Sequence, residues 1–221
     1  MNQTVSHRSL PRVLFLSLAV IVADQASKLL VKGFSLPFLG LQHRGMELGS
    51  SAPLLGNILR LTYIENPGMA FGLDLGSPFI LTVFSLAASV GVFYYLTKVP
   101  DRSLIVRSSL ALILGGALGN LVDRIFYGVL YGDAPLFYGK VVDFIDVNLF
   151  HISRFGIFNI ADAAVTTGVV VLLVFHRALD EVDEPMTGSS EEQGVSERGT
   201  GIARQELPLG GSKPEIQKIR E

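Results

Sequence analysis

The 221-residue chain contains no cysteine, and it has only four histidines. Without cysteine it can form neither a disulfide nor a thiolate zinc site, and it has no thiol nucleophile. None of the histidines is paired at a spacing typical of metal ligands: His7, His43, His151 and His176. These absences argue against a metalloenzyme, and we expect no metal or other cofactor. The formal net charge of −2 is uninformative. We expect no nucleic-acid partner.

Apolar residues are abundant, at 49% of the chain, and they come in blocks instead of at amphipathic spacing. Four blocks approach the ~20 residues that cross the hydrocarbon core of a bilayer. They are residues 13–31, 78–97, 104–122 and 157–175. The chain is therefore predicted to be an all-α membrane protein with four transmembrane helices.

The first block has a second interpretation, as a cleaved signal peptide. Its uninterrupted apolar part is short, follows Arg8 and Arg12, and precedes small residues. However, the apolar pattern resumes at residues 29–31. Asp24 and Lys28 also lie four residues apart on one helical face, where their charges neutralise each other. We interpret this block as a span.

The distribution of lysine and arginine near the ends of the blocks slightly favours both termini in the cytoplasm. Residues 1–12 then form a cytoplasmic N-terminus, residues 13–178 a membrane domain, and residues 33–77 and 127–156 its outer loops. The composition beyond Asp180 predicts a disordered cytoplasmic tail over residues 179–221.

The first outer loop contains a β-prone segment, residues 58–64, that ends at an Asn-Pro-Gly turn signal. This pattern predicts a small β-rich region at the membrane surface.

Ionisable residues at membrane depth cost roughly 2.5–3.5 kcal/mol each, so each needs a partner or a function. Asp24 and Lys28 can pair locally, and so can Asp123 and Arg124. Asp162 has no residue of opposite charge within one helical turn, so its partner must come from another part of the chain.

The nearest candidate partner is the segment VVDFIDV, residues 141–147, which carries Asp143 and Asp146 just before the fourth block. Two carboxylates in a poorly hydrated site share a proton, so that one activates water while the other polarises a carbonyl. This chemistry suits amide hydrolysis. A transporter whose carboxylates relay protons is at least as good an interpretation of Asp162, and a solvated loop charge is the simpler explanation of Asp146.

The segment GGALGNLVDR, residues 115–124, lies at the end of the third block. Gly115 and Gly119 have the small-xxx-small spacing that lets another helix approach closely. The polar residues that follow either collect hydrogen-bonding groups for a site or form only an interfacial ion pair between Asp123 and Arg124.

Five motifs together resemble the lipoprotein signal peptidases, or signal peptidase II. In the order found in that family they are DQASK (24–28), NPGMAFG (66–72), GGALGNLVDR (115–124), VVDF (141–144) and FNIAD (158–162). The resemblance spans roughly residues 13–175. It implies a four-span aspartic endopeptidase of the bacterial cytoplasmic membrane that removes signal peptides from prolipoproteins by cutting before a lipid-modified cysteine.

The family pattern also implies roles for individual residues. The catalytic pair is Asp143 and Asp162. Positions that bind the substrate or shape the site are Asn66, Asn120, Arg124 and Asn159, and those that give structural support are Asp24, Lys28 and Asp123. The resemblance further implies an active site near the outer face, prolipoproteins and membrane lipids as partners, and a monomeric enzyme.

Two kinds of departure from the family pattern leave substrate preference open. Pro67 and Met69 stand where the family usually has a small or hydroxylated residue and an alanine. The loops over residues 33–61 and 123–143 also look longer than usual.

Overall fold

The computed structural model describes residues 10–56, 58–70, 73–74, 77–100, 104–148 and 156–175. The chain divides into two units, Met1–Glu184 and Pro185–Glu221, and all described residues belong to the first. The predicted disordered tail and most of the predicted cytoplasmic N-terminus lie outside the described residues.

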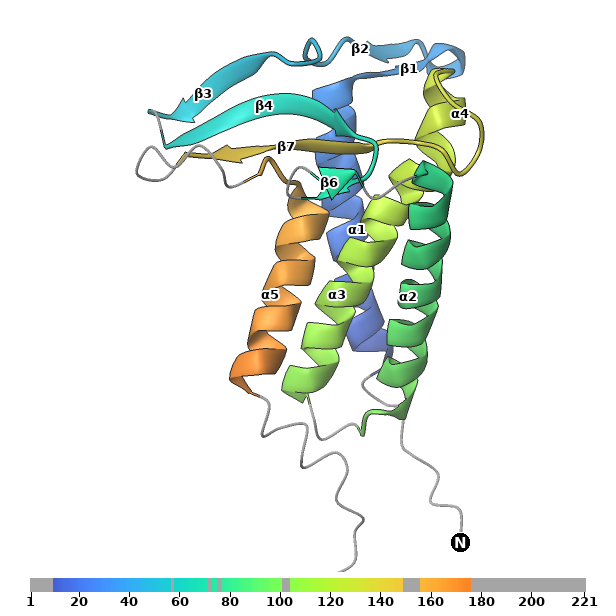
Figure 1. The fold of residues 1–221 in the computed structure, drawn as a ribbon, viewed down its shortest axis with the longest axis vertical. Helices are drawn as coiled ribbons and strands as arrows, with labels where there is room; N and C mark the ends of the chain where they lie inside the picture. Colours follow the sequence, from blue (N-terminus) through green and yellow to red (C-terminus); the bar gives the residue numbers. More distant parts are fainter. Residues whose placement is uncertain are drawn as a thin grey trace, which may run out of the picture. The chain divides into compact units, whose positions relative to one another are not determined.

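Four apolar helices lie side by side in the first unit, with the strands gathered at one end of them (Figure 1). Three are long and apolar enough to cross a membrane: α1 (Leu10–Lys32), α2 (Pro78–Lys98) and the continuous helical segment Leu104–Tyr131 that begins with α3 (Leu104–Val122). The fourth, α5 (Ile160–Val174), is apolar but has 15 residues, fewer than a span normally needs.

The third helix runs further than the sequence predicted. After α3 the chain continues through a π-helical segment, η2 (Asp123–Tyr127), and a last turn, α4 (Gly128–Tyr131). The helix ends where Gly132 adopts a left-handed conformation with φ of 73° and its N–H bonds back to the carbonyls of the last turn. The expected loop over residues 127–156 therefore begins only after Tyr131.

The strands form three small antiparallel sheets. The largest has the order β3–β4–β7, from β3 (Ser51–Leu55), β4 (Leu59–Asn66) and β7 (Val141–Val147). The others are the pair β1 (Phe34–Leu36) and β2 (Leu41–His43), joined through the 3₁₀ turn η1 (Pro37–Leu39), and the pair β5 (Met69–Ala70) and β6 (Leu73–Asp74). The β-prone segment 58–64 is thus confirmed as part of β4, whereas β7 was expected to be loop.

Helix α3 lies between α1 and α5 and packs closely on both through its glycines. A Cβ atom at Gly115 would lie 2.8 Å from the carbonyl oxygen of Ser17 on α1. A Cβ atom at Gly116 would overlap the carbonyl oxygen of Ala161 on α5. The close helix approach predicted from the small-residue spacing is confirmed, and it brings the polar ends of three helices together.

We predict that Gly116→Ala lowers the free energy of unfolding by about 1–3 kcal/mol, because the added methyl group forces α3 and α5 apart. Gly91→Ala on α2 is the matched control, since a Cβ atom there meets nothing within 4 Å. Thermal unfolding of the purified variants in detergent measures the difference. Equal midpoints for the two variants would contradict the packing described.

Candidate active site

Backbone pairing between β7 and Phe158, two residues before α5, brings the two sequence-predicted aspartates together. Phe158 donates its N–H to the carbonyl of Ile145 at 3.1 Å and accepts the Ile145 N–H at 2.7 Å. This antiparallel bridge brings the part of β7 that carries Asp143 close to Asn159, the residue that caps α5. The meeting of the VVDF and FNIAD motifs is therefore built by main-chain hydrogen bonds.

Asn159 contacts both carboxylates. Its side-chain Nδ2 donates to Asp143 Oδ1 at 2.6 Å. Its Oδ1 accepts the backbone N–H of Asp162 at 2.9 Å, and its own N–H donates to Asp162 Oδ2 at 3.4 Å. Because Asn159 is fully buried, its orientation fixes the positions of the two acids relative to each other.

Each aspartate has a second asparagine partner. Asn120 Nδ2 on α3 donates to Asp162 Oδ1 at 2.8 Å. Asn66 Nδ2, at the end of β4, donates to Asp143 Oδ2 at 3.3 Å. Three of the four residues predicted to bind substrate thus hold the aspartates themselves in the free protein.

Asp143 is almost entirely buried, with 2% of its surface exposed. Burial and, to a smaller extent, the nearby negative charge of Asp162 together raise the pKa of its carboxyl to about 7, and the two asparagine hydrogen bonds oppose the change only in part. The carboxyl of Asp143 therefore holds its proton to a higher pH than a carboxyl in water does.

Asp162 lies in the first turn of α5, nearer the helix end than the sequence suggested. The helix begins at Ile160 instead of residue 157, because Asn159 caps it and forms a reciprocal capping box with Asp162. The carboxylate therefore also lies at the positive end of the helix dipole.

A cavity of about 320 Å³ opens beside Asp162, between α2, α3 and α5. Its polar lining includes Asn120, Arg124 and Asp162, and its apolar lining includes Phe84 and Val165. Arg124, the remaining sequence-predicted binding residue, thus lines the same space as one of the two acids. A molecule in this cavity would be in contact with the carboxylate and with a fixed positive charge.

The three residues assigned to structural support form one buried ionic cluster below the site. Lys28 Nζ lies 2.8 Å from Asp24 and 2.8 Å from Asp123, and all three side chains are fully buried. Lys28 also donates to Asn120 Oδ1 at 2.9 Å. That contact turns the Asn120 amide so that its Nδ2 faces Asp162.

The cluster corrects one alternative from the sequence. Among the described residues no ion pair joins Asp123 to Arg124, because Asp123 faces α1 and pairs with Lys28. Asp123 Oδ2 also accepts the backbone N–H of Val142 at 3.1 Å, so this acid anchors β7 to the helices.

The two aspartates of VVDFIDV have different surroundings. Their positions in β7 differ by three residues, so the side chains project from opposite faces of the strand. Asp146 is half-buried and accepts a hydrogen bond from Thr62 Oγ1 at 2.8 Å. Asp143 is the member of this pair that meets Asp162 through Asn159.

Sequence reasoning missed Gln25, although the residue stands within the DQASK motif. Its Nε2 donates to Asp123 Oδ1 at 2.8 Å and to the carbonyl of Gly119 at 3.0 Å, and its Oε1 accepts the Tyr127 hydroxyl at 3.0 Å. It therefore joins α1 to the extended third helix. The signal available was its position between Asp24 and Lys28.

A second polar cluster, at Glu65, was also missed. Glu65 pairs with Lys32 and accepts the Tyr63 hydroxyl at 2.6 Å, and Lys140 lies 3.6 Å away. Burial raises the pKa of the Glu65 carboxyl, but the hydrogen bonds from Lys32 and Tyr63 and the lysine charges outweigh it, so the pKa lies below its usual value. This cluster holds the end of β4 that carries Asn66.

Within the described residues, no group of three or more histidine, cysteine, aspartate or glutamate side chains is placed to hold a metal ion. The fold and the site together define a protein of several apolar helices with two linked aspartates beside a cavity. A sequence model of the family described as signal peptidase (SPase) II matches residues 16–177.

Two curated relatives carry the name lipoprotein signal peptidase. The one from Halalkalibacterium halodurans is 37% identical over 158 residues, covering 72% of this chain and 86% of the relative. The one from Pelodictyon phaeoclathratiforme is 35% identical over 181 residues, covering 79% and 94%. The chain therefore belongs to the signal peptidase II family, and it is a protease of the bacterial membrane that crosses it more than once.

Solved structures support the fold. One described as a bacterial membrane enzyme superimposes with a TM-score of 0.59 at 25% identity, covering 82% of this chain and 96% of that structure. A second of the same description gives 0.58 at 27% identity, covering 79% and 97%. The described helices and sheets thus follow an arrangement known from experiment.

The raised pKa of Asp143 predicts how stability depends on pH. Between about pH 4 and 7 the folded protein keeps a proton on Asp143 that the unfolded chain releases, so stability falls as pH rises through this window. We expect Asp143→Asn to flatten this dependence and Asp146→Asn to leave it in place. Thermal midpoints in detergent across the pH range measure the effect, and an unchanged profile for Asp143→Asn would contradict it.

Lys28→Met is predicted to destabilise the protein by about 3–5 kcal/mol, because it leaves Asp24 and Asp123 buried without their cation. Lys98→Met, at the exposed end of α2, is the control and should change stability little. Thermal unfolding in detergent compares the two variants. Similar midpoints would show that the buried cluster does not hold the helices together.

Proposed function

We propose that this chain removes signal peptides from bacterial prolipoproteins, cutting just before the lipid-modified cysteine, and that Asp143 and Asp162 carry out the reaction. The two curated relatives are named lipoprotein signal peptidase, which supports the substrate class. The single observation that supports the chemistry is that buried Asn159 donates to both carboxylates, through its side chain to Asp143 and through its backbone N–H to Asp162.

In the proposed mechanism the two acids share one proton, which resides mainly on Asp143 because that carboxyl is the more deeply buried. Ionised Asp162 takes a proton from a water molecule as the water oxygen attacks the scissile carbonyl carbon. Protonated Asp143 donates a hydrogen bond to the carbonyl oxygen, where negative charge develops.

Collapse of the resulting tetrahedral intermediate breaks the C–N bond. The leaving nitrogen receives the proton that the dyad took from water, so the products are a carboxylic acid and an amine. The asparagine hydrogen bonds hold both acids in place throughout, which reduces the reorganisation that the reaction requires.

The cavity beside Asp162 is the proposed entry for the substrate. Its wall combines apolar side chains from α2 and α5 with Asn120 and Arg124. An apolar signal peptide would therefore meet these polar side chains close to Asp162, where the bond is cut. We infer that α5 completes a four-span domain with both termini in the cytoplasm. The strands and the dyad then lie near the outer face, at the depth where a signal peptide leaves the bilayer.

The relay of protons by a transporter receives no support from the geometry. Such a path needs carboxylates at successive depths that can each exchange protons. Asp24 and Asp123 are instead both held by Lys28 in a fully buried cluster. The arrangement therefore favours a localised reaction site.

Asp143→Asn and Asp162→Asn are each predicted to reduce cleavage by about 10²-fold or more, because each removes one half of the acid–base pair. Asp146→Asn is the matched control in the same strand and should retain most activity. The assay incubates purified protein with a lipid-modified prolipoprotein and identifies the products by mass spectrometry. Near-normal turnover by either folded dyad variant would exclude the mechanism.

A further inference from the structure

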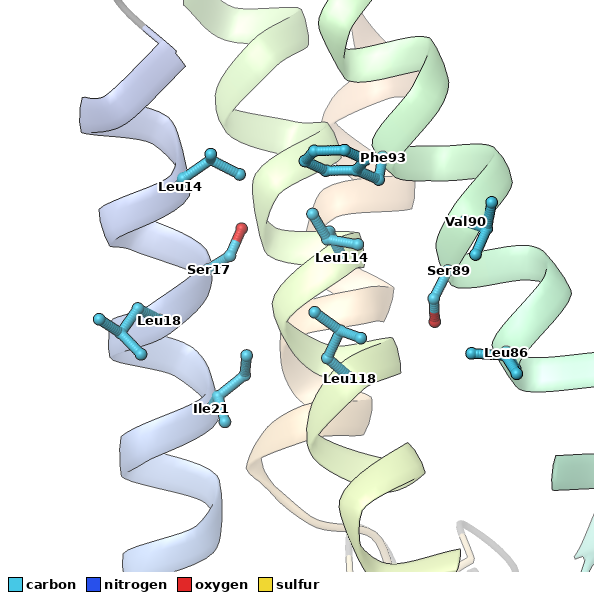
Figure 2. Close-up of a pocket in the computed structure, with 10 residues that line it drawn as sticks. All are labelled: Leu14, Ser17, Leu18, Ile21, Leu86, Ser89, Val90, Phe93, Leu114 and Leu118. Carbon is cyan, nitrogen blue, oxygen red and sulfur yellow. The ribbon is translucent and has the colours of Figure 1, made fainter. Parts of the chain in front are cut away.

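A second cavity, of about 350 Å³, lies between α1, α2 and α3 (Figure 2). Leu114 and Leu118 of α3 stand between the α1 side chains, such as Leu14, and the α2 side chains, such as Phe93 (Figure 2). None of its lining residues belongs to the cavity that contains Asp162. The proposed reaction therefore does not use this space.

The second cavity opens sideways from the middle of the helices. Leu18 on α1 and Val90 on α2, which line it, are 54% and 59% exposed, although both belong to helices long and apolar enough to cross a membrane. At this depth the surrounding medium is hydrocarbon. The occupant must therefore be able to enter from the bilayer.

The only polar side chains in the described lining are two serines, and both are already satisfied. Ser17 Oγ donates to the carbonyl of Ala111 at 2.7 Å, and Ser89 Oγ donates to the carbonyl of Ser85 at 2.8 Å. The described lining therefore offers no unsatisfied polar side chain to a lipid headgroup. Nor does it offer one to water, which needs two to four polar partners in such a site. The chemistry of the cavity is that of a hydrocarbon chain.

The side chains of the lining also disfavour a second transmembrane helix as occupant. Close helix packing in membranes relies on small residues that let backbones approach. Here the third helix presents Leu114 and Leu118, while its glycines Gly115 and Gly116 already face α1 and α5. A flexible, narrow chain fits between branched side chains where a rigid helix does not.

We propose that this cavity binds one acyl chain of a bilayer phospholipid. The bound chain fills the space between α1 and α2, which pack on each other only through α3 at this level (Figure 2). Helix α2 also lines the Asp162 cavity through Phe84, Ser85 and Ala88. The lipid therefore packs against one side of α2, and another side of α2 lines the cavity that contains Asp162.

The chain contains no tryptophan, so a single introduced tryptophan reports on the cavity without background. Phe93→Trp places the reporter in the lining. Tyr94→Trp places it at the same depth on a side chain that is 63% exposed and is not part of the lining. The probe is phosphatidylcholine brominated at mid-chain, added to each purified variant in detergent micelles at increasing mole fraction.

If the cavity binds an acyl chain, quenching of Phe93→Trp saturates and is half complete at a mole fraction severalfold lower than that for Tyr94→Trp, which follows the bulk lipid content. Superimposable curves would mean ordinary annular contact and would overturn the proposal. A Phe93→Trp reporter that stays unquenched while Tyr94→Trp is quenched would mean that another occupant, such as a second copy, covers the cavity. That result would overturn it as well.

Filling the cavity gives an independent check. Val90→Phe, combined with Phe93→Trp, should abolish the saturable component, while Val83→Phe should leave it unchanged. Val83 is the matched control because it is an exposed valine of the same helix outside the lining. If Val90→Phe fails to fold, Leu18→Phe fills the same space from α1. A saturable component that persists in the folded filled variant would overturn the proposal.

Discussion

The hydrogen bonds of Asn159 are the interaction on which the site depends. Its side-chain amide donates to the carboxylate of Asp143 on the strand and accepts the backbone N–H of Asp162 on the helix, and the residue is fully buried. An amide that lost either partner would leave a buried polar group unsatisfied, which is costly in a water-poor setting. Formation of the sheet and capping of α5 are therefore coupled to assembly of the dyad.

A second constraint is the buried ionic cluster between the helices, where Lys28 alone compensates the charges of Asp24 and Asp123. The contact of Lys28 with Asn120 joins this cluster to Asp162, so the ionic cluster and the dyad form one continuous network. The glycines of α3 allow this network to form, because bulkier residues would separate the helices that supply its members.

Much of this arrangement could be predicted from the sequence. The apolar blocks mark the helices, the unpaired Asp162 indicates that a distant partner is needed, and the β-prone run before Asn66 identifies β4. The identity of that partner depends on strand register: a solvated loop charge was the simpler explanation of Asp146, but only the resemblance to the family assigned Asp143. The extension of the third helix to Tyr131 was missed because its stop signal, Gly132, lies beyond a polar stretch that resembles a loop. Gln25 escaped notice because three of its partners, Gly119, Asp123 and Tyr127, lie far from it in the sequence.

The ion pair of α1 has a consequence for biogenesis. Asp24 and Lys28 lie one turn apart on α1, which is synthesised before the other described helices, so this helix can enter the membrane with these two charges already neutralised. The second carboxylate arrives only with the third helix, nearly a hundred residues later in translation. Lys28 can therefore bind Asp24 first in the nascent protein. Its later pairing with Asp123 would join two separately inserted helices into one folded domain.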